Sequence, residues 1–314
     1  MVQMIDAAGV AQATPFPALV DALEAAFRKP PETPRRHHYD VDKNNPGRMT
    51  LLNMPAWEAD RYMGVKLVSV APENTARGLP TVSGFYLLFS AQDGQPLAFI
   101  DAAELTARRT AAASALASRY LSRPDAKRLL VVGTGKLSAY MAQAHAAVRD
   151  FDVIEIWGRN PDKAEAAVDA ARAAGLEARV AVDLEASARQ ADVISCVTSS
   201  ARPVISGDWL KEGTHLDLVG AYRPDMREVD DSAIRKARIF VDTFENALHE
   251  AGEILIPMKA GVIARDDVLA DLFDLAQGRK KARISAGEVT LFKSVGTSLE
   301  DYAGACLVVE NLPA

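Results

Sequence analysis

Leu129-Leu-Val-Val-Gly-Thr-Gly-Lys-Leu-Ser138 has the pattern of a buried strand followed by a glycine turn and a helix. Gly133 permits the tight turn that a dinucleotide-binding fold needs here, and Gly135 lets the backbone approach a pyrophosphate closely. A helix that begins near Lys136 would direct its free N–H groups and its positive dipole end at that phosphate. The segment therefore predicts a dinucleotide site formed by Gly133, Thr134, Gly135, Lys136 and Leu137.

The next strand, Val153-Ile-Glu-Ile-Trp157, indicates which dinucleotide binds. In this fold the residue at the strand tip faces the adenosine ribose, where an acid suits NAD and an arginine suits the 2′-phosphate of NADP. The tip carries Arg159 and no acid, with Asn160 beside it. A guanidinium can hold a phosphate through two hydrogen bonds. We expect NADPH as the cofactor and NADH as a weaker one; the competing interpretation is an ordinary solvated arginine.

The composition of the 314 residues is that of a soluble globular protein, since 49% are hydrophobic, 25% are charged and the net charge is −6. The length is enough for two domains. The mild acidity argues against nucleic-acid binding, and no apolar stretch is long enough to cross a membrane. Cys196 and Cys306 have no metal-ligand spacing, and no signal peptide is evident at the N-terminus. We therefore expect a cytoplasmic protein without a bound metal.

Strand and turn signals divide the chain near residues 122–124. Before this linker the sequence predicts a helical segment over 1–28, strands over 48–54, 62–70, 81–89 and 96–100, and a helix over 102–120. After it, strands alternate with helices, which is typical of a doubly wound parallel sheet. The strands are expected at 128–132, 153–157, 178–182, 192–197, 215–219 and 238–242. Ligands bind outside the carboxyl ends of such strands, so loops 133–137, 159–160, 198–200 and 220–222 are the expected contact segments.

Several motifs, in order and spacing, resemble the ornithine cyclodeaminase/μ-crystallin family over essentially the whole chain. They include Gly64-Val-Lys66-Leu-Val, Leu105-Thr-Ala-Arg-Arg109-Thr, Val132-Gly-Thr-Gly135 and Ser294-Val-Gly296-Thr. The resemblance implies an α/β protein with a Rossmann doubly wound parallel sheet at 123–292. This domain would be inserted in a smaller α+β substrate-binding and dimerisation domain made of 1–122 and 293–314. The resemblance also implies a homodimer, with active sites between the two domains.

The same resemblance assigns the substrate carboxylate to Arg48, Lys66 and Arg109, with Lys66 as a candidate for proton transfer. It places Thr198 beside the adenosine, and Ser294, Val295 and Gly296 near the nicotinamide. Arginines suit a small amino-acid-like substrate because they hold its one fixed anion in a defined orientation. Lys66 interrupts an apolar strand, where an unpaired charge would be costly. Each cation could instead be a surface charge or an internal ion-pair partner, and only the resemblance selects Arg109 over Arg108.

Val219-Gly-Ala-Tyr222 departs from the cyclodeaminase pattern, which has an aspartate at the position of Tyr222. A phenol is a poor base near neutral pH, and Asp225, beyond Pro224, need not face the site. The segment from Arg223 to Glu228 instead resembles the ketimine reductase branch of the family. Arg159 also fits that branch. We expect NADPH-dependent reduction of Δ1-pyrroline-2-carboxylate and Δ1-piperideine-2-carboxylate to L-proline and L-pipecolate. The alternatives are an ornithine cyclodeaminase, an amino-acid dehydrogenase and a non-catalytic NADPH-dependent binding protein.

Overall fold

The computed structural model describes residues 2–45 and 47–312 and divides the chain into two compact units. Unit 1 comprises residues 1–110 and 298–314, and unit 2 comprises residues 111–297. The expected boundaries, after 122 and before 293, therefore differ from those of the structure. The second half of α3 (Ala102–Leu121) belongs to unit 2, because the Arg149 guanidinium donates hydrogen bonds to the Ser118 and Arg119 carbonyls. The roles of the two units remain predictions.

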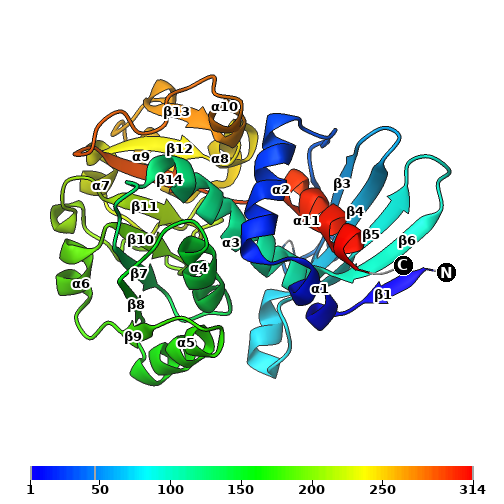
Figure 1. Cartoon of the computed structure of the whole chain (residues 1–314), viewed down its shortest axis with the longest axis horizontal. Helices are drawn as coiled ribbons and strands as arrows, with labels where there is room; N and C mark the ends of the chain where they lie inside the picture. The colour runs from blue at the N-terminus through cyan, green and yellow to red at the C-terminus, as the bar shows by residue number, and fades with distance from the viewer. Residues whose placement is uncertain (1, 46, 313–314) are drawn as a thin grey trace. The chain divides into compact units, whose positions relative to one another are not determined.

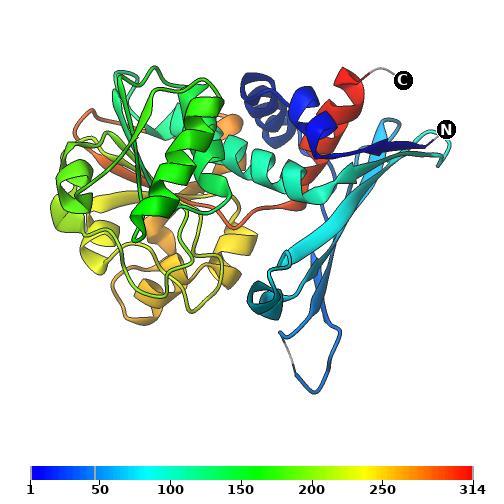
Figure 2. The same ribbon diagram turned by 90° about the horizontal axis from the view of Figure 1, so that it is seen from below.

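Unit 1 is built on a six-stranded sheet with the order β1–β6–β5–β4–β3–β2 (Figure 1). Its strands are β1 (Gln3–Ile5), β2 (His37–Asp40), β3 (Thr50–Trp57), β4 (Tyr62–Val70), β5 (Val82–Ser90) and β6 (Pro96–Asp101). β1 is parallel to β6, and every other pair is antiparallel. Figure 2 shows β2 and the start of β3 extending beyond the other strands. The four predicted strands of this unit are present, whereas β1 and β2 were not expected.

The helices α1 (Ala7–Ala13), α2 (Phe16–Arg28) and α11 (Ser298–Asn311) complete unit 1. The single helical segment expected over residues 1–28 is wrong in detail, because it contains a strand and two helices. Pro15 lacks the N–H group that a continuous helix would need, so the helix is interrupted there. Pro15 is the N-cap residue from which α2 begins. Along α2, Leu19, Leu23 and Phe27 are fully buried, as their four-residue spacing predicted.

Unit 2 is a doubly wound sheet of eight parallel strands in the order β13–β12–β14–β11–β10–β7–β8–β9 (Figure 1). The strands are β7 (Arg128–Val132), β8 (Val153–Trp157), β9 (Ala178–Val180), β10 (Val193–Cys196), β11 (His215–Leu218), β12 (Ala237–Val241), β13 (Val268–Asp271) and β14 (Val289–Lys293). The helices are α4 (Leu137–Ala146), α5 (Pro161–Ala173), α6 (Leu184–Gln190), α7 (Asp231–Lys236), α8 (Phe244–Glu250), α9 (Gly252–Lys259) and α10 (Leu272–Ala276). The α/β class and all six predicted strands of this sheet are confirmed. β13 and β14 were not expected.

The ends of the strands in unit 2 lie in one row, because the register aligns them. Val132 pairs with both Trp157 and Cys196, Cys196 pairs with Leu218, and Leu218 pairs with Lys293. All the loops in which we expected cofactor contacts therefore leave the same edge of the sheet. Among the described residues, no helix is both long enough and apolar enough to span a membrane.

Candidate functional site

The glycine turn after β7 has the geometry that the sequence predicted. Gly133 has a φ of +132°, a backbone conformation that disfavours side chains, and its N–H group donates to the Trp157 carbonyl at 2.8 Å. A Cβ atom added at Gly133 would lie 3.0 Å from Val197, whereas one added at Gly135 would meet nothing within 4 Å. Ser138 is fully buried, and its hydroxyl donates to the Gly133 carbonyl at 2.7 Å. The turn is tight on its protein side and open at Gly135, which fits a pyrophosphate.

The tip of β8 carries Gly158, Arg159 and Asn160. A Cβ atom at Gly158 would lie 2.2 Å from the Thr134 methyl group, so this tip packs directly on the glycine turn. The Asn160 side chain caps α5 by accepting a hydrogen bond from the Lys163 N–H group at 3.1 Å. Arg159 is exposed and forms no ion pair within the part of the chain that the structure describes. Its guanidinium therefore has no competing carboxylate.

A buried glutamate joins the loops that follow β10 and β11. One oxygen of the Glu228 carboxylate accepts from the Thr198 N–H group at 2.6 Å and from the Thr198 hydroxyl at 2.8 Å. The other accepts from the Gly220 and Ala221 N–H groups at 2.9 and 3.2 Å. A Cβ atom at Gly220 would lie only 2.0 Å from the Thr198 carbonyl oxygen. Thr198 thus lies at the carboxyl edge of the sheet, as predicted. Glu228, which holds it there, was noted in the sequence only as part of a motif.

Two more buried charges support Glu228. The Glu253 carboxylate accepts from the backbone N–H groups of Glu228 and Val229 at 2.7 and 3.1 Å. Burial raises the pKa of Glu253 to about 7, partly offset by the positive charge of Lys293, while Glu228 raises it further. Lys293 is itself fully buried at the end of β14. These three side chains form a buried charged cluster under the loops of the carboxyl edge.

The Ser294–Gly296 segment is also held by one carboxylate. Asp242, which follows β12, accepts from the Val295 and Gly296 N–H groups at 2.7 and 2.6 Å and from the Ser294 hydroxyl at 3.2 Å. All three predicted residues therefore lie in one turn at the carboxyl edge of unit 2. Sequence reasoning missed Asp242.

A second group of candidate site residues lies within unit 1. The Lys66 ammonium on β4 lies 2.6 Å from a carboxylate oxygen of Asp301, and the Arg109 guanidinium on α3 lies 2.8 Å from the other. Arg109 also lies 2.5 Å from the Glu300 carboxylate. The Thr106 hydroxyl is 3.4 Å from the Lys66 nitrogen. The structure thus brings together two of the three predicted carboxylate-binding residues and adds two acids that the sequence did not indicate.

Burial and neighbouring charges shift the pKa values of this group. Burial lowers the pKa of Lys66 to about 8, and the charges of Arg109 and Arg36 act in the same direction against the opposing effect of Asp301. Burial would raise the pKa of Asp301, but Arg109 and Lys66 outweigh it and hold that pKa below its ordinary value. Lys66 and Arg109 thus share the carboxylates of Glu300 and Asp301, and the charge of Arg36 reaches Lys66.

Arg48 is the predicted substrate residue that the structure does not bring to this group. It is exposed and pairs with Asp42 at 2.9 Å and with Glu73 at 3.8 Å. Thr50, two residues further along, is opposite Val70, four residues beyond Lys66 on β4. Arg36 is instead close enough for its charge to act on Lys66. In the sequence, the adjacent pair Arg35 and Arg36 after Pro34 was the feature that could have indicated Arg36 as a candidate.

The residues around Tyr222 leave that phenol exposed. Tyr222 is 52% exposed, and the Asp225 carboxylate accepts two hydrogen bonds from Arg223 at 2.9 and 2.6 Å. Asp225 is therefore engaged by its neighbour and is not free to take the place of the missing aspartate.

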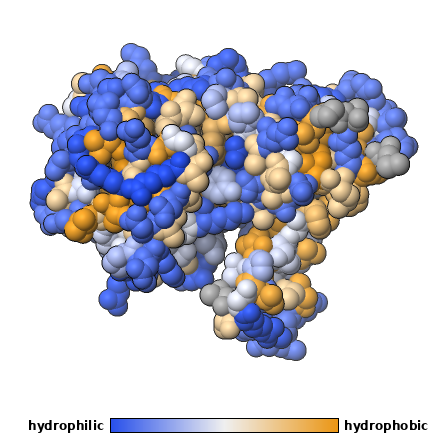
Figure 3. Space-filling view, turned by 60° about the horizontal axis from the view of Figure 1, so that its bottom comes forward, coloured by the Kyte–Doolittle hydropathy of each residue, from blue (hydrophilic) through white to orange (hydrophobic). Residues whose placement is uncertain are grey.

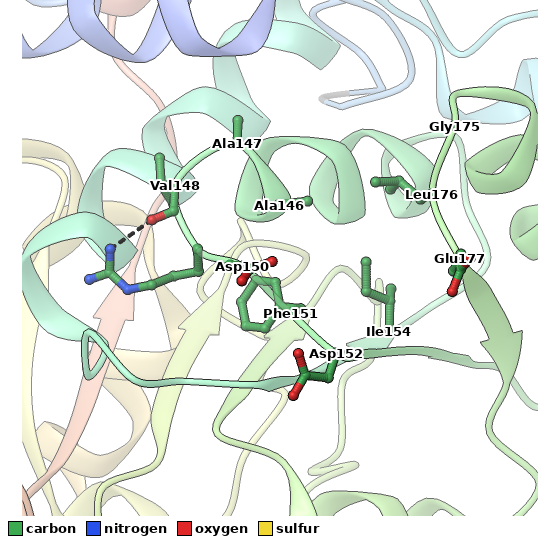
Figure 4. A pocket seen from close by; sticks show the side chains of 11 residues that line it. Ala146, Ala147, Val148, Asp150, Phe151, Asp152, Ile154, Gly175, Leu176 and Glu177 are labelled. Atoms are coloured by element: carbon green, nitrogen blue, oxygen red, sulfur yellow. Dashed lines mark hydrogen bonds between the residues drawn. The ribbon is translucent and has the colours of Figure 1, made fainter.

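A cavity of about 600 Å³ in unit 2 lies away from the loops at the carboxyl edge of its sheet. Figure 4 shows it lined by the end of α4, by Asp152 and Ile154 at the start of β8, and by Leu176 and Glu177. This is the amino edge of the sheet, opposite the loops described above. Nothing in the cavity belongs to the candidate site.

Comparisons with known proteins show which family the chain resembles. A family model described as the ornithine cyclodeaminase/mu-crystallin family matches residues 1–314. The chain is 36% identical over 316 residues to the Delta(1)-pyrroline-2-carboxylate reductase of Colwellia psychrerythraea, with 99% of each chain covered. The structure of Thermococcus litoralis Delta(1)-pyrroline-2-carboxylate reductase in complex with NADH and L-proline is 33% identical, with a TM-score of 0.91, and covers 99% of this chain and 97% of that one. An archaeal alanine dehydrogenase dimer with bound NAD is 31% identical, with a TM-score of 0.89 and coverage of 99% and 95%.

Proposed function

The chain belongs to the ornithine cyclodeaminase/mu-crystallin family, and we propose that it catalyses the NADPH-dependent reduction of cyclic imino acids at their C=N bond. The substrates would be Δ1-pyrroline-2-carboxylate and Δ1-piperideine-2-carboxylate, and the products L-proline and L-pipecolate. An oxidoreductase that uses a nicotinamide cofactor is supported by the relatives named above. The observation that carries the proposal is the buried pair Lys66 and Arg109, two cations that one carboxylate, Asp301, holds close together in unit 1.

The cofactor is assigned to the carboxyl edge of unit 2. Its pyrophosphate would be held by the turn of Gly133, Thr134 and Gly135 and by the start of α4 at Lys136 and Leu137, where Gly135 leaves open space. Thr198 and the Ser294–Gly296 turn would border the rest of the dinucleotide. When bound, the nicotinamide supplies the hydride.

The substrate carboxylate is assigned to Lys66 and Arg109 in unit 1. Two adjacent cations suit an imino acid with a single carboxylate, because both can donate hydrogen bonds to its oxygens. Because a protonated imine is already electrophilic, the main task of these residues is to fix its orientation. Arg48 remains a predicted third contact, although the structure places its charge beside Asp42. Arg36, whose charge reaches Lys66, is the better placed third cation.

NADPH is proposed over NADH because of Arg159. The guanidinium is exposed at the strand tip beside the glycine turn, and it has no carboxylate partner in the described part of the chain. An unpaired guanidinium at this position suits a 2′-phosphate. NADH is proposed as a weaker cofactor, because the Thermococcus litoralis relative was solved with NADH.

A homodimer is proposed from the outer face of the sheet in unit 1. Met63, Leu67 and Phe85 lie on the face of β4 and β5 opposite Lys66, and they are 37%, 36% and 47% exposed. Trp57 on β3 pairs with Met63 and is 40% exposed. Figure 3 shows apolar side chains at the surface of this unit. Contiguous exposed apolar residues of this kind mark protein interfaces, and the archaeal alanine dehydrogenase is itself a dimer.

A dehydrogenase of open-chain substrates is the second candidate, because the alanine dehydrogenase matches nearly the whole chain. One assay separates the candidates. Purified protein is given NADPH with either cyclic imine, with an open-chain 2-oxo acid plus ammonia, or with the cofactor alone. We expect cofactor oxidation with the cyclic imines. Oxidation only with the open-chain acid and ammonia would instead assign the dehydrogenase function.

A further inference from the structure

The first turn of α11 carries two acids that no solvent reaches. Glu300 and Asp301 are both fully buried, although they begin a helix whose later residues are mostly apolar. Carboxylates are stabilised near the positive end of a helix, but that alone does not explain complete burial. Their partners are cations that enter from other elements of unit 1.

Asp301 contacts both cations of the proposed carboxylate site. One of its oxygens lies 2.6 Å from the Lys66 nitrogen and the other 2.8 Å from the Arg109 Nε atom. Lys66 is supplied by β4, Arg109 by α3 and Asp301 by α11. Glu300, by contrast, contacts Arg109.

We propose that Asp301 is a positioning residue of the imino-acid site, which fixes Lys66 and Arg109 in one geometry and keeps Lys66 charged for the substrate carboxylate. The inference rests on the proposed function, because it takes Lys66 and Arg109 as the carboxylate ligands. It adds a role for a residue that contacts them rather than the substrate.

The surroundings of Lys66 give the expected direction of the effect. The groups that face Lys66 are Asp301 on α11, Arg109 and Thr106 on α3, Tyr86 opposite it on β5, and Arg36 before β2. Burial and both arginines lower the pKa of Lys66, and Asp301 raises it. Without the charge of Asp301, burial and the two arginines would lower the pKa of Lys66 further. Lys66 would then lose its proton at a lower pH.

The test is the pH dependence of kcat/KM in the imine assay. In the wild type, kcat/KM should fall as the pH rises through about 8, the pKa of Lys66. In Asp301→Asn this fall should begin about 1–3 pH units lower, since an opposite charge at this distance shifts a pKa by that amount. At a fixed pH near 7.5 the loss of efficiency should be about ten- to hundredfold. Titration of the substrate itself is common to both proteins and cancels in the comparison.

Two variants separate this role from a loss of packing. Glu300→Gln is the matched control, because it removes a neighbouring buried charge that contacts Arg109; it should reduce efficiency and move the alkaline fall less than Asp301→Asn does. Asp301→Glu retains the charge on a longer side chain, and it should keep the alkaline fall near that of the wild type while losing efficiency. An alkaline fall that stays in place in Asp301→Asn, or that moves equally in Glu300→Gln, would overturn the proposal.

A second measurement does not depend on catalysis. In protein labelled with ¹³C at the lysine Cε carbon, the Lys66 resonance is identified by its loss in Lys66→Met and is then titrated. The pKa should be lower in Asp301→Asn than in the wild type, and should change less in Glu300→Gln. An equal pKa in all three proteins would refute the role of Asp301. If the NMR titrations give the expected pKa differences but the wild type reduces no imine, the proposed function alone would be refuted.

Discussion

Lys66 and Arg109 are buried together with their countercharges, an arrangement that stability alone does not favour. Removing charges from water costs several kcal/mol per ion, and an apolar replacement of a buried ion pair is often neutral or stabilising. Lys66 is 3% exposed, and Arg109 is 5% exposed. We therefore propose that the group serves to bind a substrate carboxylate, for which Lys66 and Arg109 are the donors.

We propose that Arg159 determines the choice between NADPH and NADH. Arg159→Asp should weaken the affinity for NADPH by about ten- to hundredfold, because one charge-assisted contact to the 2′-phosphate is lost. Its affinity for NADH should change little or improve, since an acid suits a free ribose hydroxyl. The measurement is the Kd of each cofactor by titration of protein fluorescence. Equal losses for NADPH and NADH would remove Arg159 from the site.

At the residue scale the sequence predicted the cations and missed their partners. Lys66 is visible because a charge interrupts an apolar strand, and Arg109 because it lies in a family motif. Asp301 is separated from Arg109 by 192 residues, and such a long-range pair has no local signal. Arg48 was predicted from the resemblance, but the register of β3 on β4 carries it away from Lys66.

At the scale of elements, the loops of the carboxyl edge are held by buried carboxylates. Glu228 receives four hydrogen bonds from the loops after β10 and β11, and Asp242 receives three from the turn after β14. Loops fixed in this way lose little further freedom when a ligand binds, which favours affinity.

Glu228→Gln should therefore weaken cofactor binding more than it affects the hydride step. An amide retains one acceptor oxygen and places an N–H₂ group against backbone donors, so about tenfold loss of cofactor affinity is expected. The measurement compares the KM for NADPH with kcat. Glu253→Gln is the matched control. The Glu253 carboxyl has a pKa raised to about 7 and contacts no cofactor loop, so a neutral amide there should change the KM for NADPH less. Unaltered cofactor KM in Glu228→Gln would contradict this account.

The elements that could be predicted are those with a local pattern. The six strands β7 to β12 follow the alternation of strand and helix, and the glycine turn after β7 identifies the sheet. β14 is a five-residue strand that ends in Lys293 and inserts between β11 and β12, which only the complete sheet reveals. β1 has three residues and β2 is exposed along its length, so neither shows a hydrophobic period.

At the scale of the whole molecule, the apolar outer face of the sheet in unit 1 predicts self-association. The wild type should be a dimer in analytical ultracentrifugation. Phe85→Glu should dissociate it, because a buried unpaired carboxylate at an interface is costly. Val182→Glu, which changes an apolar residue of unit 2 that is 95% exposed, is the matched control and should remain a dimer. A Phe85→Glu protein that stays dimeric would show that this face is not the interface.

The reduction of a cyclic imino acid tests the central claim most directly. Wild-type protein with NADPH and Δ1-pyrroline-2-carboxylate or Δ1-piperideine-2-carboxylate should form L-proline or L-pipecolate in a one-to-one ratio to the NADPH oxidised. Lys66→Met should bind NADPH normally and lose this activity, and the wild type with NAD and L-ornithine should release no ammonia. Formation of proline and ammonia from ornithine, or near-normal imine reduction by a folded Lys66→Met protein, would contradict the account.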